Sequence, residues 1–217
     1  MIPYQHYAFK TGPVSRGPHR GRFLTARQSA ELCVTHQDYG KYINECSEHL
    51  VRLLDIKPDD VVLDIGSGLG DMAKNISNTA QHVHCCDINE QLLNFAKESY
   101  GDEANMSFYL VDNIDQPLSF LPDGSITKAY SWAVFSHNGH YVIQKYLEDI
   151  VRVLKPKGIF RFEIISKEGK KSQATNIIEN NSEAINEAIR SAGLELLHDE
   201  TLTQSTLNTA HNKVVRK

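Results

Sequence analysis

The stretch from Val61 to Asp71, VVLDIGSGLGD, carries the strongest signal for the fold. Its first five residues form a short apolar, β-branched run, which is typical of a buried strand. Three glycines at alternate positions follow, and glycine permits the tight turn that leads from a strand into a helix. We therefore expect a strand over 61–65, a glycine loop, and a helix over 71–79. The carboxylate of Asp71 suits the positive N-terminus of that helix.

Strand-like and helix-like segments alternate after this stretch. Further strands are expected over 82–87, 107–111, 129–135 and 159–165, near 194–202 and near 211–216. Helices are expected over 90–100, 141–154 and 182–192, the last with Ser182 as its N-cap. Strands that alternate with helices imply right-handed crossovers and a sheet covered on both faces. The expected fold is α/β, a doubly wound and mostly parallel seven-stranded sheet.

The segment before the glycine stretch has a different character. Residues 1–24 contain three prolines and three glycines among several aromatic residues, which indicates irregular structure. Two helices are expected behind it, over 25–36 and 41–54, the second with an apolar face at helical spacing. The chain is therefore divided into an N-terminal extension over 1–55, expected to act as a substrate lid, and a cofactor-binding domain over 56–217. A short link after the fifth strand leaves little room for a lid there.

The composition and the net charge limit the classes to which this protein can belong. The chain has 217 residues and a formal net charge of -4, which argues against a general nucleic-acid binder. The charge is uneven, because residues 1–30 contain five bases and no acid, and this leaves a local anion site open. We see no apolar run of about 18 residues and no signal peptide. Four cysteines form no Cys-x-x-Cys pair, so a cytoplasmic protein without membrane contact is expected.

Two kinds of ligand are weighed for the glycine loop. A dinucleotide fingerprint, Gly-x-Gly-x-x-Gly, would require its third glycine at position 71, which is Asp71. An aspartate there would also repel a pyrophosphate at the helix N-terminus. Glycines without a Cβ allow a ligand to approach the backbone N–H groups closely. The spacing around Gly66, Gly68 and Gly70 therefore favours a ligand that carries no phosphate at this place.

Two segments carry a resemblance to a known family. VLDIGSGLGD (62–71) resembles motif I of the S-adenosylmethionine-dependent methyltransferases with a Rossmann-like fold. YLEDIVRVLKPKGIFRFE (146–163) is similar to the helix, turn and fifth strand of that family, with Lys157 where the family usually has glycine. The resemblance runs from about residue 40 to the end of the chain, and the segment 131–137 looks more like the small-molecule branch. It implies S-adenosylmethionine as the cofactor.

The resemblance also implies which residues hold the cofactor. Asp87, at the end of the second strand, would bind the ribose hydroxyls, since a carboxylate can accept two hydrogen bonds from a vicinal diol. Asp112, which Asn113 could assist, would hold the adenine amino group, and Asp64 would organise the loop and the methionine end. The expected cofactor-binding residues are Asp64, Gly66, Ser67, Gly68, Gly70, Asp87, Ile88, Asp112, Asn113 and Trp132. A structural role as core residue remains open for Trp132.

The end of the fourth strand is the expected place for chemistry. It carries neither the Asn/Asp-Pro-Pro-Tyr nor the Pro-Cys motif of the families that methylate nucleobases. His137 is the candidate base or substrate orienter, with a purely structural loop histidine as the alternative. Aromatic and cationic residues before the first strand suit an anionic or aromatic substrate, although such N-termini are often only surface-laid. The candidate substrate residues are Tyr4, Tyr7, Arg20, Arg22, His36, Tyr39 and Tyr42.

No metal site is expected. Strand alternation places His82, His84 and Cys86 on one face, but a sheet covered by helices offers no open coordination position. The expected activity is methyl transfer to an oxygen or nitrogen of a small molecule, anionic substrates included. An RNA or protein methyltransferase that uses the basic N-terminal arm and a catalytically silent cofactor-binding protein remain as alternatives. The sequence leaves the methyl acceptor and the oligomeric state open.

Overall fold

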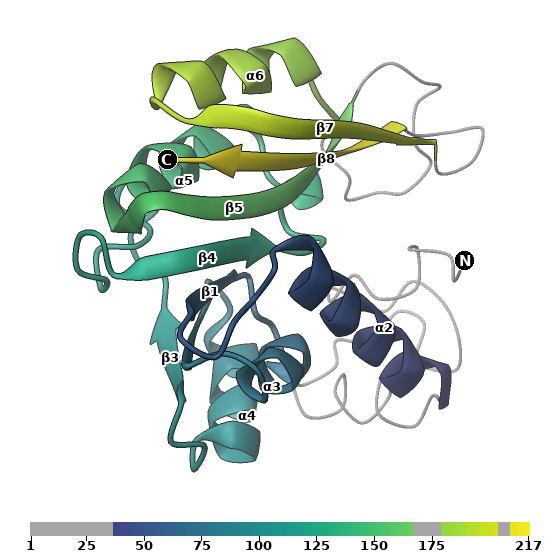
Figure 1. Cartoon of the computed structure of the whole chain (residues 1–217), viewed down its shortest axis with the longest axis vertical. Coiled ribbons are helices and arrows are strands. Elements are labelled where there is room, and N and C mark those ends of the chain that lie inside the picture. Colours follow the sequence, from purple (N-terminus) through teal and green to yellow (C-terminus); the bar gives the residue numbers. More distant parts are fainter. Residues whose placement is uncertain (1–36, 167–178, 204–208) are drawn as a thin grey trace.

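The computed structural model of the chain describes residues 37–166, 179–203 and 209–217 (Figure 1). These residues form one eight-stranded sheet with the order β3-β2-β1-β4-β5-β8-β7, and a short β6 pairs with β5 off this path. Strands β1 to β5 are mutually parallel, and β8 runs antiparallel to β5 and β7. The strands are β1 Val61–Ile65, β2 His82–Asp87, β3 Met106–Leu110, β4 Ile126–Ser131, β5 Leu154–Ser166, β6 Glu179–Asn180, β7 Glu195–Thr203 and β8 Thr209–Arg216.

Helices cover both faces of this sheet, which confirms the predicted α/β architecture. One core joins α2 and α3 to β1 and β2 through Leu50, Val62 and Ile76. The other joins α5 and α6 to β1, β4 and β5 through residues such as Ile150 and Phe162. The helices are α2 Gln37–Leu53, α3 Asp71–Ser77, α4 Glu90–Tyr100, α5 His140–Val153 and α6 Ser182–Ser191, with a 3-10 turn η2 at Phe135–His137.

The fourth strand differs from its prediction. It spans Ile126–Ser131, whereas the sequence predicted 129–135. Ala133 has a φ of 57°, a left-handed conformation that ends the strand. The apolar residues that suggested a longer strand serve another purpose, because Phe135 is buried against Phe162 with ring centroids 5.5 Å apart. The segment after Ser131 therefore leaves the sheet at its carboxyl edge.

The described part of the N-terminal extension packs into the domain core. Leu50 and Leu54 are buried together with Val62 of β1 and Ala73 of α3. A boundary at residue 55 thus falls inside a shared core, and the role of the extension as a lid stays a prediction. The helix predicted over 25–36 lies outside the described residues. Among the described residues, no helix is long and apolar enough to cross a membrane.

The start of α6 corrects a second local prediction. Asn181, not Ser182, is its N-cap, and the Asn181 side chain accepts a hydrogen bond from Ala184 N at 3.0 Å. Ser182 Oγ instead accepts a hydrogen bond from Lys213 Nζ at 3.2 Å. Asn181 caps the helix and Ser182 does not, because only the residue just before the helix has the extended conformation of a cap.

Candidate functional site

The carboxyl ends of the parallel strands meet at one edge of the sheet, and the predicted cofactor residues gather there. Strand β1 lies between β2 and β4, so the chain order reverses at β1. This is the topological switch point at which open α/β sheets bind ligands. Asp64 lies near the end of β1, Asp87 ends β2, and Asp112 follows β3. The structure thus brings three acidic residues from three strands to the same edge.

Backbone N–H groups of the glycine loop donate hydrogen bonds to the end of β2. Gly66 N and Ser67 N both donate to Cys86 O, at 2.8 and 3.0 Å, and Gly68 N donates to Asp87 Oδ2 at 2.8 Å. This differs from the expectation that these N–H groups face a ligand. They already have partners in the protein, because the turn folds back over the end of β2. Recognition of a ligand by this loop therefore depends on other groups.

The side chain of Val134, which follows β4, packs against the glycine loop at Gly66. A Cβ placed on Gly66 would lie 2.3 Å from Val134 Cγ2, and the φ of Gly66 is +76°. Glycine is required at position 66 on both counts. The sequence analysis did not identify Val134, since nothing local to residue 134 indicates contact with a turn near residue 66. The contact shows that the segment after β4 lies directly against the glycine loop.

Asp87 supports the loop and keeps capacity for a ligand. It is 9% exposed, and its Oδ1 and Oδ2 accept hydrogen bonds from Asn89 N and Gly68 N, each at 2.8 Å. Burial raises the pKa of Asp87, while the backbone N–H groups of Asn89 and Gly68 oppose that rise. Each carboxylate oxygen can accept a further hydrogen bond. Asp87 can therefore accept two donors from a ligand at the strand edge.

Asp64 is the most deeply buried acid of the site. It is 3% exposed, and burial raises its pKa to about 7. The Tyr130 hydroxyl acts against this rise, and the negative charge of Asp87 adds to it. No cationic side chain of the described residues contributes to the pKa of either carboxyl. Two neighbouring carboxyls without a compensating cation favour a positively charged ligand and disfavour a pyrophosphate.

Further groups at this edge suit a ligand that is partly polar and partly apolar. The hydroxyls of Ser67 and Ser131 are buried and have no hydrogen-bond partner among the described residues. Ile88 is 67% exposed, and Leu110 at the end of the neighbouring strand is 39% exposed. Exposed aliphatic side chains beside buried polar atoms are typical of a binding site. The sequence analysis included Ser67 and Ile88 but missed Ser131 and Leu110.

Asp112 and Asn113 follow β3 and are exposed. The Asn113 side chain accepts a hydrogen bond from Asp115 N at 3.0 Å and so shapes its own turn. Nothing in the described residues contradicts their predicted contact with adenine, which stays a prediction.

His137 and Trp132 lie in the segment after β4. His137 is half-buried at the end of η2, and its backbone N–H donates to Val134 O at 2.9 Å. The Trp132 ring lies 4.4 Å from the guanidinium carbon of Arg161. Trp132 also packs against the core under α2 and α3. Both residues are thus at the ligand edge, and their predicted roles stay predictions.

The predicted substrate residues fall on the part of the chain that the structure leaves undescribed. Tyr4, Tyr7, Arg20, Arg22 and His36 lie outside the described residues. Tyr39 and Tyr42 belong to α2, but their side chains are not described. In the described ranges, His82 Nε2 contacts Ser107 Oγ at 2.9 Å, and no group of three His, Cys, Asp or Glu side chains is arranged for a metal ion.

The chain is similar to known methyltransferases in sequence. Residues 62–158 match the family described as "Methyltransferase domain". The chain is 29% identical over 137 residues to a glycine/sarcosine/dimethylglycine N-methyltransferase of Actinopolyspora halophila, covering 61% of this chain and 24% of that protein. It is 28% identical over 193 residues to the sterol 24-C-methyltransferase ERG6B of Gibberella zeae, covering 80% and 50%. Other matches include ribosomal RNA small subunit methyltransferases.

Comparison with solved structures shows the same fold. Geranyl diphosphate C-methyltransferase from Streptomyces coelicolor, solved with Mg2+, geranyl-S-thiolodiphosphate and S-adenosyl-L-homocysteine, superposes with a TM-score of 0.66 at 12% identity. The superposition covers 84% of this chain and 81% of that one. The chain spans about a quarter of the length of the first curated relative and half of the second. These relatives act on different acceptors, as their names state.

Proposed function

We propose that this chain, whose residues 62–158 match the methyltransferase domain family, transfers the methyl group of S-adenosylmethionine to an oxygen or nitrogen of a small molecule. The observation that carries this proposal is the pair of buried carboxyls, Asp64 and Asp87, which lack a compensating cation among the described residues. S-adenosylmethionine is a sulfonium cation with a ribose diol, and it carries no phosphate. Its charge and donors therefore complement these two acids.

The residues at the strand edge fit this cofactor. Asp87 would accept the ribose hydroxyls with the lone pairs that the backbone leaves free. Ile88 and Leu110 would cover the adenine with apolar surface. Ser67 and Ser131 would direct their buried hydroxyls to the amino-acid end. A pyrophosphate dinucleotide fits less well, because it would add negative charge beside two acids.

The chemistry depends on alignment more than on an acid–base group. The cofactor supplies an electrophilic methyl group on sulfur. The segment after β4 would hold the acceptor against that methyl group and exclude water, which accounts for most of the expected rate enhancement. His137, half-buried at the end of η2, would orient the acceptor or remove its proton. Val134 fixes how closely this segment approaches the glycine loop.

A small-molecule acceptor is favoured by what the segment after β4 contains. Residues 131–141 carry neither of the nucleobase-methylating motifs named above. The N-methyltransferase relative, named for glycine, sarcosine and dimethylglycine, supports the same class. The five bases of residues 1–30 would suit an anionic substrate. The matched RNA methyltransferases keep RNA as the alternative that an experiment must separate.

A methyl-transfer assay tests the acceptor class. The protein is incubated with methyl-labelled S-adenosylmethionine and with separate small-molecule, RNA and protein fractions of a cell extract. We expect label in the small-molecule fraction and a rate reduced at least tenfold in His137→Ala. Label in RNA alone, with salt-dependent binding, would replace the proposal by its RNA alternative. Tight cofactor binding without any labelling would indicate the silent cofactor-binding protein.

A further inference from the structure

A buried ion pair lies on β5 beside the segment that follows β4. Arg161 is 1% exposed and Glu163 6% exposed, and Arg161 Nη2 donates to Glu163 Oε2 at 2.8 Å. The two side chains share one face of β5, because they are two residues apart. Phe160 and Phe162 point into the core on the opposite face. The charged pair thus occupies interior positions that apolar side chains would fill at lower cost.

The pair holds three successive residues, the last residue of β4 and the two that follow it. Arg161 Nη1 donates to Ser131 O at 3.0 Å, and Ala133 N donates to Glu163 Oε1. Between these two contacts, the Trp132 ring lies 4.4 Å from the guanidinium carbon of Arg161. The backbone on both sides of Trp132 and its ring are therefore all held by the same ion pair. These contacts connect positions about 30 residues apart in the sequence.

Ala133 needs such support because of its backbone conformation. Its φ of 57° lies in the left-handed region, which is unfavourable for a residue with a Cβ. A charge-assisted hydrogen bond from Ala133 N–H to a buried carboxylate is stronger than one to a neutral acceptor. The hydrogen bond that Ala133 N donates to Glu163 can therefore stabilise a turn that the local sequence disfavours.

The direction of the chain after this turn determines the geometry of the site. Val134 packs against Gly66, and Phe135 enters the core between α5 and β5. His137 follows at the end of η2. A change in the backbone conformation of Ala133 would displace the side chains of Val134, Phe135 and His137 together, because these residues follow it within one short turn.

We propose that the Arg161–Glu163 pair positions the segment from Ser131 to His137 against the glycine loop, so that cofactor affinity and methyl transfer depend on it. Arg161 and Glu163 are positioning residues, since neither is among the residues expected to touch the cofactor. Asn212 of β8 assists by accepting a hydrogen bond from Arg161 Nη2 at 2.5 Å. The part that concerns cofactor affinity rests on the proposed function.

Two measurements on three variants test this inference. Trp132 is the only tryptophan of the chain, so its fluorescence reports on the segment even without a ligand. In Glu163→Ala we expect emission shifted to longer wavelength and at least tenfold weaker binding of S-adenosylhomocysteine. Arg161→Lys should also shift the emission, because an ammonium group cannot hold Ser131, Trp132 and Glu163 together. Glu163→Gln should stay within about threefold of wild-type affinity, since its amide oxygen can still accept from Ala133 N.

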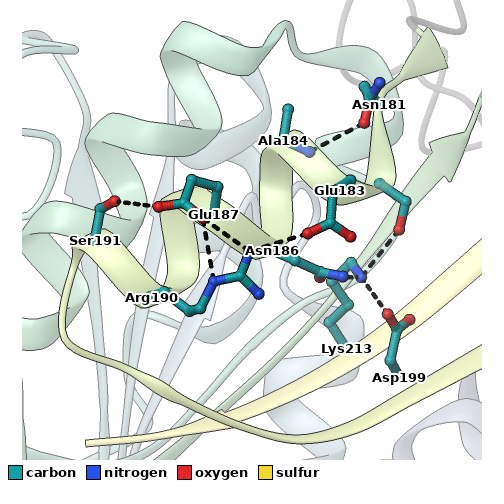
Figure 2. Close-up of polar contacts among 10 residues, drawn as sticks. Asn181, Glu183, Ala184, Asn186, Glu187, Arg190, Ser191, Asp199 and Lys213 are labelled. Carbon is teal, nitrogen blue, oxygen red and sulfur yellow. Dashed lines mark hydrogen bonds and ion pairs between the residues drawn. The ribbon is translucent and has the colours of Figure 1, made fainter.

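A second ion pair, in which the lysine is buried, provides the control. Lys213 is fully buried, and its Nζ donates to Asp199 Oδ2 at 2.7 Å, to Asn186 Oδ1 at 2.7 Å and to Ser182 Oγ at 3.2 Å (Figure 2). Asp199→Asn weakens this pair on the α6 side of the sheet. It should lower resistance to urea without moving the emission of Trp132 or the affinity for S-adenosylhomocysteine.

The outcomes separate this inference from the proposed function. Unchanged Trp132 emission in Glu163→Ala and Arg161→Lys would overturn the inference, whether or not the wild type binds S-adenosylhomocysteine. A shifted emission with wild-type affinity would also overturn it, because the segment would then be irrelevant to the cofactor. Failure of the wild type to bind would contradict the proposed function, and the emission would still decide the positioning role. If Glu163→Ala does not fold, Arg161→Lys decides by the same criteria, and Glu163→Gln serves as the variant that should keep near-wild-type affinity.

Discussion

Asp87 accepts two hydrogen bonds from the protein, and its carboxylate can accept further ones. Replacing it by alanine removes the acceptor for both the cofactor ribose and Gly68 N. We predict that Asp87→Ala weakens S-adenosylhomocysteine binding by about 1.5 to 3 kcal/mol, as for lost charged hydrogen bonds. Calorimetry measures this directly. Asp71→Ala is the control, since the Asp71 carboxylate accepts a hydrogen bond from the Tyr100 hydroxyl at 2.6 Å on the side of α4. Equal affinities for wild type and Asp87→Ala would remove Asp87 from the site.

Asp64 predicts a pH dependence of cofactor affinity. With its pKa raised to about 7 by burial, this carboxyl is largely protonated at pH 6 and ionised at pH 8. The sulfonium charge does not titrate, and it favours the ionised form of Asp64. Affinity for S-adenosylmethionine should therefore rise as pH increases from 5.5 to 7.5, by at most about tenfold per pH unit.

A variant isolates the contribution of Asp64 to this pH dependence. In Asp64→Asn the position carries no titrating group, so the slope of affinity against pH should be shallower than in the wild type. Calorimetry in buffers of different ionisation enthalpy should also detect proton release when the wild type binds below pH 7. A wild-type slope that persists in Asp64→Asn would assign the pH dependence to another group.

Position in the sequence made some site residues predictable. Asp64 and Asp87 could be proposed because each lies at the end of an apolar run, and parallel strands end at a common edge. Val134 and Glu163 could not be proposed, because their contacts with Gly66 and Ala133 join distant parts of the chain. No local pattern reports such contacts. The residues that shape the site are therefore harder to predict than those that line it.

The irregular start of β5 contains a residue with a suboptimal backbone conformation. Lys157 is exposed and has a φ of 67°, in the region that favours glycine. We predict that Lys157→Gly raises the free energy of unfolding by about 1 kcal/mol, since glycine adopts this conformation without strain. Urea denaturation measures the change. Lys157→Ala, which keeps a Cβ, should show no comparable gain, and an equal gain in both variants would refute the backbone explanation.

Elements bounded by strong local signals were predicted well. The bounds of β1, β2 and α4 agree with the sequence prediction, because glycines follow β1 and Asn89 caps α4. The end of β4 was wrong for a physical reason. Apolar residues from Trp132 to Phe135 resemble a strand, but a left-handed Ala133 and long-range packing turn them out of the sheet. Tertiary contacts thus override local propensity where the site is formed.

The stability of the whole molecule should depend on pH through His84. Burial, with a contribution from His82, lowers the pKa of His84 to about 4, below the ordinary value of 6.5. The unfolded chain then binds a proton that the folded chain does not, so this contribution to stability is lost as pH falls from 6.5 towards 4. Because the ring keeps partial contact with solvent, we expect a loss of about 1 to 2 kcal/mol.

The comparison of wild type with His84→Gln tests this dependence. Asp64 acts in the opposite direction, since its raised pKa favours the folded state at low pH. Only the difference between the two proteins therefore isolates His84. Urea denaturation at pH 7 and at pH 4.5 should show that the wild type loses more stability than the variant on acidification. Parallel losses would show that the pKa of His84 is not lowered in the folded protein.

At the scale of the molecule, an acidic ligand edge and a basic N-terminal segment belong to one chain. The net charge of -4 combines five bases in residues 1–30 with an excess of acids elsewhere. The described residues account for the cofactor edge, whereas the predicted substrate residues from Tyr4 to His36 lie outside them. The α/β sheet is confirmed, and residues 62–158 match the methyltransferase domain family. The predicted lid is still to be tested.

Calorimetric titration of the unmodified protein with S-adenosylhomocysteine, with NAD in a parallel titration, tests the central claim most directly. Asp87, which can accept the ribose hydroxyls, predicts binding of S-adenosylhomocysteine at micromolar concentration. The uncompensated carboxyls of Asp64 and Asp87 disfavour a pyrophosphate, so no measurable binding of NAD is expected. Absence of S-adenosylhomocysteine binding at high micromolar concentration, or tighter binding of NAD, would contradict the account.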